Sequence, residues 1–323
     1  MKTFIIGCGS IGLRHAENLK QLGYTIDYIF DIDNDKASKI SYKFHATKIK
    51  NTIEGMKKSD VVFICTPPDT HTKYIKQAIT YQSHVFCEKP ISNDKKNLIQ
   101  ILKEADRKNI QIMIGYMLRF HPGLIYVKDL INSGSIGKIL GGQVKFGYLL
   151  SKWRPEEDYR KNYFATNKTG GGIILDASHE IDYVRWIFDE IKSVFCISSK
   201  VSDLEIETQD YAAIIFETIS NQIVEIHLDC VDYKYERSCR ILGSEGSINW
   251  DFNGKISFNK NNSSKEITKN YILNDLYIRE VEHFMKTIKL NQKNISDGWN
   301  GLKTLDLALA SISSSKTGKK LSV

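Results

Sequence analysis

The chain has 323 residues, of which 41% are hydrophobic and 26% charged. This composition is typical of a folded protein and provides enough apolar material for two ordinary domains. Apolar runs such as Val61–Cys65 are much shorter than the roughly 20 residues that a membrane helix needs, and the N-terminus enters a strand pattern without a signal segment. We therefore expect a cytoplasmic protein that does not bind a membrane.

Charge and cysteine usage exclude further classes. The formal net charge is +7, but the lysines are spread along the chain without a basic block. This pattern argues against nucleic-acid binding and is compatible with an anionic ligand such as a nucleotide. The six cysteines form no CxxC pair and have no histidine cluster beside them, so we expect reduced, mostly buried thiols, no metal site and no disulfide framework.

The first part of the chain alternates short apolar strands with amphipathic helices. Strands are predicted at Thr3–Ile6, Ile26–Phe30, Val61–Cys65, His84–Cys87 and Ile110–Ile114. Helices are predicted at Ile11–Leu22, Ala37–Phe44, Thr72–Tyr81 and Lys95–Lys108, with Ser92, Asn93 and Asp94 as candidate N-caps of the last one. Such alternation predicts an α/β fold, a doubly wound parallel sheet of the Rossmann type, over residues 1–121.

After His121 and Pro122 the pattern changes, and residues 122–323 are predicted to form a second, α+β domain with a mostly antiparallel sheet. A helix at Leu124–Asn132 comes first. Strands follow around Gln143–Tyr148, Ala212–Phe216, Ile223–Leu228 and Ser238–Leu242. A Gly170–Gly172 turn leads into a helix at Ala177–Phe188, and helices return at Leu276–Lys289 and Gly298–Ser313.

A glycine-rich turn follows the first strand and opens the first helix. It consists of Gly7, Cys8, Gly9, Ser10, Ile11 and Gly12. A lone GxGxxG is weak evidence, but this context is typical of a dinucleotide-binding turn, in which the pyrophosphate lies at the helix N-terminus. The sequence therefore predicts that these residues bind a nicotinamide dinucleotide.

Asp31 ends the second predicted strand, about twenty residues beyond the turn, where a carboxylate can accept hydrogen bonds from the adenosine ribose. It would repel a 2′-phosphate, and no arginine follows it directly, so the predicted cofactor is NAD rather than NADP. In the alternative interpretation Asp31 only caps the next helix.

Further motifs follow the later strands. They are Cys65-Thr66-Pro67-Pro68-Asp69-Thr70-His71, Glu88-Lys89-Pro90, and Gly115-Tyr116 leading to Arg119, Phe120 and Pro122. Together with the glycine turn, the segment Gly170–Trp186 and the C-terminal Ala310–Val323, they resemble the glucose-fructose oxidoreductase / inositol dehydrogenase (Gfo/Idh/MocA) family. The resemblance implies hydride transfer at a sugar or cyclitol carbon, a substrate held between the domains, and a large open sheet that commonly mediates homodimers or homotetramers.

The resemblance also implies residue roles. Lys89 is similar to the family's active-site lysine and His179 to its catalytic histidine. Thr66, Pro67, His71 and Glu88, with Lys89, are expected on the cofactor side. Many members place three residues between the aspartate and the histidine, whereas Asp176 and His179 are separated by two, so Asp182 is a competing carboxylate.

These residue types suit alcohol oxidation. His179 can accept the hydroxyl proton as hydride leaves, Lys89 can hold the same oxygen, and a carboxylate from Asp176 or Asp182 can fix the imidazole tautomer. In the alternative interpretation both residues have only structural roles: Lys89 is an exposed lysine at a strand end, and His179 is a hydrogen-bonded histidine at a domain interface.

A second group of residues is expected to contact substrate, because arginines and aromatic faces suit sugars and their anionic groups. It consists of Tyr116, Arg119, His121, Trp153, Arg154 and Tyr163. The stretch from Trp153 to Tyr163 is either a substrate lid or a packed loop or oligomer contact. Together with the Gly170–Gly172 turn and the segment Asp176–Tyr183, Trp153–Arg160 resembles members associated with bacterial surface-polysaccharide sugar synthesis. Two other functions stay open, a redox-neutral glycosidase or epimerase-like reaction and a non-catalytic NAD-sensing regulator.

Overall fold

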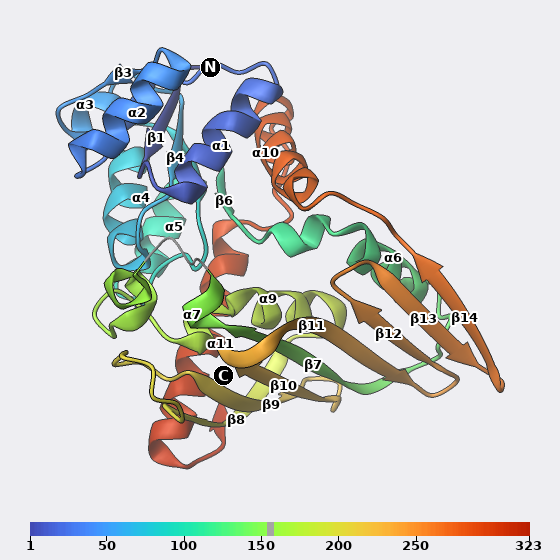
Figure 1. The fold of residues 1–323 in the computed structure, drawn as a ribbon. Coiled ribbons are helices and arrows are strands. Elements are labelled where there is room, and N and C mark those ends of the chain that lie inside the picture. Colours follow the sequence, from blue (N-terminus) through green and yellow to red (C-terminus); the bar gives the residue numbers. More distant parts are fainter. Residues whose placement is uncertain (154–157) are drawn as a thin grey trace. The chain divides into compact units, whose positions relative to one another are not determined.

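The computed structural model describes residues 1–153 and 158–323 (Figure 1). The chain divides into two units, each of which we describe by itself. The first unit consists of Met1–Met117 and Leu273–Lys303, and the second consists of Leu118–Ile272 and Thr304–Val323.

The first unit is built on a parallel sheet of six strands in the order β3-β2-β1-β4-β5-β6. Its strands are β1 (Thr3–Ile6), β2 (Tyr28–Phe30), β3 (Thr47–Lys48), β4 (Val61–Ile64), β5 (His84–Cys87) and β6 (Ile112–Ile114). Every residue of β1 and β4 is buried, as expected for strands covered on both faces. The strand order reverses between β1 and β4, and in such sheets ligands bind beyond the carboxyl ends of the strands at this point. The predicted Rossmann fold is confirmed.

Helices connect these strands. The connecting elements are α1 (Ser10–Gln21), α2 (Asn34–Phe44), α3 (Thr52–Met56), the 3₁₀ turn η1 (Pro68–Thr70), α4 (His71–Thr80) and α5 (Leu98–Arg107), and α10 (Leu273–Leu290) joins the unit from a later part of the chain. The predicted N-caps of α5 are wrong. Its N-cap is Asn97, in the left-handed conformation, because Ser92 accepts a hydrogen bond from Thr72 and Asp94 accepts one from the Lys96 backbone, so both act within the preceding loop.

The segment Leu273–Lys303 folds with the first unit, which a single division of the chain at residue 121 does not anticipate. The Phe284 ring of α10 packs against Phe63 and Phe86 of the sheet, with ring centroids 6.0 and 5.7 Å away. The Ile114 amide donates a hydrogen bond to the carbonyl oxygen of Ser296 at 2.8 Å. An amphipathic stripe predicts a helix but not the surface that the helix covers, so the sequence pattern could not assign α10.

The second unit contains a sheet of nine strands in the order β14-β13-β12-β11-β7-β10-β9-β8-β15. The strands are β7 (Ile139–Leu149), β8 (Ile191–Ser199), β9 (Tyr211–Thr218), β10 (Ile223–Asp229), β11 (Val231–Gly243), β12 (Ser247–Asp251), β13 (Lys255–Lys260), β14 (Ser263–Thr268) and β15 (Leu321–Ser322). Neighbouring strands are antiparallel except β10 and β7, which run parallel. The predicted large and mostly antiparallel sheet is confirmed.

The helices of this unit include α6 (Pro122–Asn132), α7 (Leu150–Trp153), α8 (Ile173–Asp176), α9 (Ser178–Ile187) and most of α11 (Gly298–Thr317). Short 3₁₀ turns are η2 (Met117–Phe120), η3 (Tyr159–Lys161) and η4 (Tyr163–Ala165). Along β9 and β10 buried and exposed residues alternate, so one face of the sheet forms the core while the other faces outward. Within the described ranges, no helix is long and apolar enough to span a membrane.

The packing of α10 leads to a stability prediction. Phe284 is fully buried, so Phe284→Ala should lower the free energy of unfolding by about 3 to 5 kcal/mol through lost burial and a residual cavity. Urea unfolding followed by tryptophan fluorescence measures the loss. Tyr42→Ala, at a side chain exposed on α2, is the control and should change stability by about 0.5 kcal/mol or less. A similarly small loss for Phe284→Ala would contradict the assignment of α10 to this core.

Candidate active site

The glycine turn between β1 and α1 is built so that two of its glycines permit close packing and the third faces open space. Gly7 has φ +96°, and a Cβ there would lie 2.4 Å from the Cys65 carbonyl oxygen. A Cβ at Gly12 would lie 1.9 Å from the Gly7 carbonyl oxygen. At Gly9 a Cβ would have no atom within 4 Å. The chain can therefore approach a ligand at Gly9, where no protein atom fills the space.

The same turn fits a dinucleotide. Gly9 is the N-cap of α1 and offers no side chain to cap the first amide groups of the helix, which leaves their positive end for a phosphate. Asp31 follows β2, and its two carboxylate oxygens accept hydrogen bonds from the Cys8 amide at 2.6 Å and the Asp33 amide at 2.8 Å. Each oxygen keeps capacity for a ribose hydroxyl. The cap of α2 is Asp33 rather than Asp31, because Asp33 accepts from the first amides of that helix.

The loops after β4 and β5 are joined by a buried histidine. The Nε2 atom of His71 lies 2.7 Å from the Thr66 carbonyl oxygen, and its Nδ1 atom lies 2.8 Å from the Pro90 carbonyl oxygen. Burial lowers the pKa of His71, although both carbonyl contacts oppose the shift. His71 thus links the loop of Thr66 and Pro67 to the loop that carries Lys89.

Glu88, in the second loop, makes contacts through both carboxylate oxygens. Its Oε1 atom is 2.6 Å from His15 Nε2, and its Oε2 atom accepts a hydrogen bond from the Lys89 amide at 3.3 Å. Burial by itself would raise the pKa of Glu88, but the hydrogen bond and charge of His15, together with Lys89, outweigh burial and lower that pKa. A Cβ at Gly115 would lie 3.3 Å from both carboxylate oxygens, so this position favours glycine.

His15 is a residue that the sequence analysis did not select. Its partner is distant in sequence, so no local motif identifies the contact. The available signal is its spacing, because His15 lies with Gly12, Ala16 and Leu19 on the buried face of α1. A histidine in such a stripe requires a buried polar partner.

In the second unit, the carboxylate of Asp176 is held by two tyrosines. The Tyr148 hydroxyl donates to Asp176 Oδ2 at 3.2 Å, and the Tyr163 hydroxyl donates to Oδ1. Burial and the nearby Asp176 charge raise the pKa of Tyr148 well above its ordinary value, so this tyrosine stays a donor. The structure therefore brings together Tyr163, expected as a substrate contact, and Asp176, expected in the catalytic group.

The helix that carries His179 is fixed by ion pairs. Asp182 accepts two hydrogen bonds from the Arg119 guanidinium, both at 2.8 Å, and both side chains are buried. Arg237 Nε lies 2.7 Å from Glu180 Oε1, and these side chains are buried as well. Such pairs hold α9 in place, because removal of one partner would leave an uncompensated buried charge. His179 is itself 8% exposed.

The remaining expected substrate residues occupy different environments. His121 caps α6 through Nδ1 and lies 3.1 Å from the Phe252 carbonyl oxygen through Nε2, while burial lowers its pKa to about 4. Trp153 is half exposed and stacks on Tyr235 with centroids 5.6 Å apart. Tyr116 is fully buried. Arg154 lies outside the described residues.

All six cysteines are free and buried. Among the described residues, no group of three or more histidine, cysteine, aspartate or glutamate side chains could hold a metal ion.

Comparison with known families agrees with both units. Residues 1–116 match the model of the Gfo/Idh/MocA oxidoreductase family with an NAD-binding Rossmann fold, and residues 124–249 match the Gfo/Idh/MocA C-terminal domain. The chain belongs to the Gfo/Idh/MocA family. The resemblance that the sequence motifs indicated is thus confirmed, and NAD is the cofactor of the family's Rossmann fold.

Two relatives and two solved structures illustrate this membership. The myo-inositol 2-dehydrogenase of Thermotoga maritima is 26% identical over 327 residues, covering 96% of this chain and 95% of that protein. An inositol 2-dehydrogenase of Rhizobium meliloti is 25% identical, with coverage of 99% and 98%. Levoglucosan dehydrogenase in complex with NADH and levoglucosan has a TM-score of 0.91 at 17% identity over 100% of this chain and 99% of that one. The WlbA dehydrogenase from Bordetella pertussis, in complex with NADH and UDP-GlcNAcA, has a TM-score of 0.86 at 19% identity over 100% and 98%.

Substitutions in the glycine turn should affect NAD affinity and protein stability separately. Gly9→Ala should leave stability nearly unchanged, because its Cβ meets open space, but should weaken NAD binding about tenfold or more by blocking the pyrophosphate. Titration calorimetry and thermal unfolding measure the two effects. Gly12→Ala is the contrasting variant and should lose stability, because its Cβ would overlap the Gly7 carbonyl. Unchanged NAD affinity in Gly9→Ala would show that the dinucleotide does not use this turn.

Proposed function

We propose that this protein is an NAD-dependent dehydrogenase that oxidises, or in reverse forms, a hydroxyl carbon of a sugar, sugar nucleotide or sugar acid. The observation that carries this proposal is the placement of the glycine turn and Lys89 in one unit. The turn follows β1, and Lys89 comes two residues after β5. Because β1 and β5 are parallel strands of one sheet, both features belong to its carboxyl edge. The names of the inositol dehydrogenase relatives and the sugar ligands of the solved neighbours support the substrate class.

The bound NAD would accept the hydride. Gly7 to Gly12 and Asp31 bind its pyrophosphate and ribose in this proposal, while the loops of Thr66, Pro67, His71 and Glu88 line its nicotinamide side. Lys89 donates a hydrogen bond to the reacting oxygen and stabilises its negative charge as the proton leaves.

His179 accepts that hydroxyl proton. Either Asp176 or Asp182 supplies the carboxylate that orients its ring in this proposal. The carboxylate of Asp182 already accepts two hydrogen bonds from Arg119, and Asp176 accepts from two tyrosines. This difference favours Asp182 as a support for α9 and Asp176 as the group closer to the chemistry.

Trp153 and Tyr235 add a stacked aromatic pair with an exposed edge. Such a face suits a sugar ring or a nucleotide base, and on this ground a role in surface-polysaccharide sugar synthesis is part of the proposal. Tyr116, Arg119, His121, Arg154 and Tyr163 complete the proposed substrate group. Six free thiols suit a reducing compartment, so we place the protein in the cytoplasm.

The catalytic assignment predicts the behaviour of two variants. Lys89→Ala and His179→Ala should each lower kcat by about a hundredfold or more, because a proton acceptor and an oxyanion donor contribute at that scale. NADH formation with a panel of sugars and sugar nucleotides measures turnover, and NAD affinity should change little in His179→Ala. His45→Ala, on the surface beyond α2, is the control. Turnover near the unmodified level in either variant would remove that residue from the mechanism, and sugar conversion without net NADH would favour the redox-neutral alternative.

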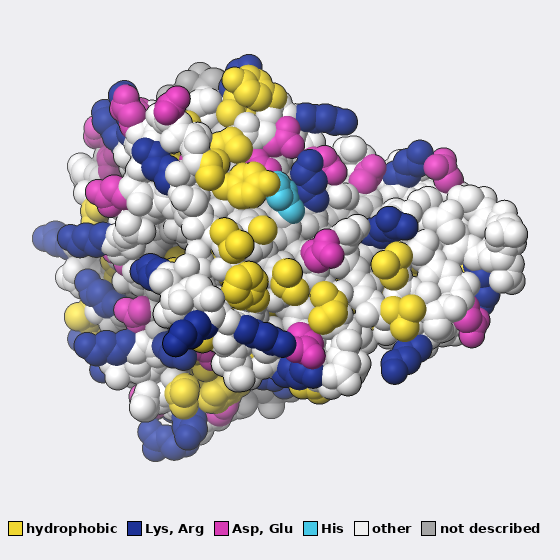
Figure 2. Space-filling view, turned by 90° about the horizontal axis from the view of Figure 1, so that it is seen from below, with side chains coloured by type: hydrophobic (Ala, Val, Ile, Leu, Met, Phe, Trp, Pro, Cys, Tyr) yellow, Lys and Arg dark blue, Asp and Glu magenta, His cyan; other side chains and the backbone are white. Residues whose placement is uncertain are grey.

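We further propose that the outward face of the nine-stranded sheet pairs with a second copy of the chain, giving a homodimer or homotetramer. Side chains on this face include Ile197, Tyr211, Ile215 and Ile223, which are 64%, 37%, 43% and 47% exposed. Figure 2 shows hydrophobic side chains gathered there with charges of both signs among them. Proteins rarely expose a patch of this kind without a partner.

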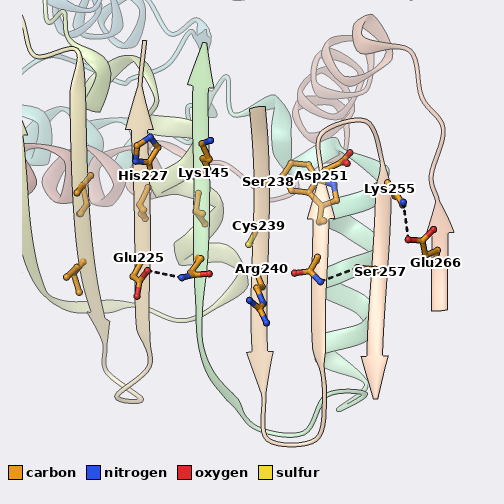
Figure 3. Close-up of a pocket in the computed structure, with 18 residues that line it drawn as sticks. Lys145, Glu225, His227, Ser238, Cys239, Arg240, Asp251, Lys255, Ser257 and Glu266 are labelled. Carbon is orange, nitrogen blue, oxygen red and sulfur yellow. Dashed lines mark hydrogen bonds and ion pairs between the residues drawn. The ribbon is translucent and has the colours of Figure 1, made fainter. Parts of the chain in front are cut away.

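Polar side chains on this face can also pair across a two-fold axis. A shallow hollow of about 750 Å³ is lined by acidic and basic residues of β7, β10, β12, β13 and β14. Figure 3 shows Lys145 on β7, Glu225 and His227 on the neighbouring β10, and Asp251 on β12, which is separated from β7 by β11. A surface that holds both signs is complementary to itself, as an isologous interface requires.

Two substitutions test this interface. Ile197→Glu and Ile215→Glu should shift the protein toward monomer, because pairing of the two copies would bury an added carboxylate at an apolar position. Light scattering coupled to size-exclusion chromatography measures the mass in solution. Tyr42→Glu, exposed on the first unit, should leave the mass unchanged. A monomeric unmodified protein, or an unchanged oligomer in both sheet variants, would contradict the proposal.

A further inference from the structure

The dinucleotide turn and the Lys89 loop are connected by a buried polar contact. His15 lies in α1, the helix that begins at the glycine turn, and its Nε2 atom is 2.6 Å from Glu88 Oε1. The second oxygen of the same carboxylate accepts the Lys89 amide at 3.3 Å. One carboxylate thus joins the helix of the turn to the peptide that carries the active-site lysine.

The surroundings of this contact make it costly to lose. The His15 side chain is fully buried and that of Glu88 is 12% exposed. The imidazole packs against Phe63 and Phe86, with centroids 5.8 and 4.8 Å away. A carboxylate in apolar surroundings is destabilised in its charged form unless a donor holds it. His15 is that donor, and no other described side chain of α1 makes a hydrogen bond to Glu88.

The charged and titratable groups around Glu88 are few. Lys89 lies beside it in the chain, and His71 of α4 is close enough to feel its charge. The thiols of Cys65 and Cys87 also face it, and burial raises the pKa of both well above the ordinary value, so they stay neutral. On α10, Tyr277 faces the His15 ring at 6.3 Å and is covered by the Arg14 guanidinium. Among the described residues, His15 and Lys89 are therefore the groups that stabilise the charged form of Glu88.

We propose that His15 is a positioning residue of the hydride-transfer site, which keeps the Glu88 carboxylate ionised and oriented and thereby fixes the peptide of Lys89. This inference rests on the proposed function of Lys89. His15 touches neither substrate nor cofactor in this account, and it acts only through Glu88.

The proposal predicts a change in pH dependence. In the intact protein His15 offsets the effect of burial and lowers the pKa of Glu88. In His15→Leu only Lys89 still opposes the effect of burial, so the pKa of Glu88 should rise and the carboxyl should become protonated at a higher pH than in the unmodified protein. Activity should then be lost on the acid side at a higher pH than in the unmodified protein. At neutral pH kcat should fall about tenfold or more, because a displaced Lys89 is sensitive to small shifts, while the KM for NAD changes less.

Further variants separate positioning from stability. His15→Gln keeps an amide donor and should restore most of kcat and the original pH profile. Glu88→Gln should have a low kcat, but its activity should not show the additional loss at acidic pH that is expected of His15→Leu. His84→Leu is the matched control, because it removes an imidazole from the opposite end of β5, where His84 accepts only the Gln111 amide. His84→Leu should keep the unmodified profile.

A readout without cofactor completes the test. Nuclear magnetic resonance of the cofactor-free protein detects the ring nitrogens of its histidines. The His15 resonances are assigned by their loss in His15→Gln, and they should shift in Glu88→Gln. The inference is wrong if His15→Leu keeps the unmodified pH profile and loses no more kcat than His84→Leu does. It is also wrong if the His15 resonances do not shift in Glu88→Gln. If Lys89→Ala retains turnover, the proposed role of Lys89 fails instead, and the resonance shift still decides whether the contact exists.

Discussion

The close approach of α1 to the end of β1 is the constraint on which the first unit depends. A side chain at Gly7 or Gly12 would overlap backbone atoms, whereas the position of Gly9 opens to empty space. This approach points the uncapped end of α1 outward at the strand-order reversal, where an anion is favoured. It also directs the buried face of the same helix, with His15, toward Glu88. One packing arrangement thus prepares a phosphate site and supports the peptide of Lys89.

The second unit contains several charged side chains that are buried in apolar surroundings and paired with one another. Helix α9 presents Glu180 and Asp182 to Arg237 and Arg119, and all four side chains are buried. Buried pairs contribute little net stability, but their fixed geometry makes alternative positions of the helix costly. The cluster of Asp176 with Tyr148 and Tyr163 is similarly rigid. We interpret this rigidity as preorganisation around His179, which in the proposed mechanism accepts a proton and must keep its orientation during hydride transfer.

Local patterns in the sequence predict the features that depend on local geometry. The glycine spacing, the strand end at Asp31 and the lysine after β5 follow from strand and helix periodicity, and the structure has them at those places. Contacts between distant segments were not predictable in this way. The His15–Glu88 contact spans 73 positions and the Arg119–Asp182 pair spans 63, so no spacing rule identifies either. The short β3 and α3 were missed because segments of two and five residues are too short to show a hydrophobic period.

Direct transfer of hydrogen from substrate to cofactor is the central claim of this account. The most direct measurement incubates the protein with NAD and a panel of sugars and sugar nucleotides carrying deuterium on the carbon of each oxidisable hydroxyl, and locates the label by nuclear magnetic resonance. We expect deuterium from one substrate to appear on the reduced nicotinamide ring, with the matching carbonyl compound as the other product. Bound NAD that acquires no deuterium from any member of the panel would contradict it.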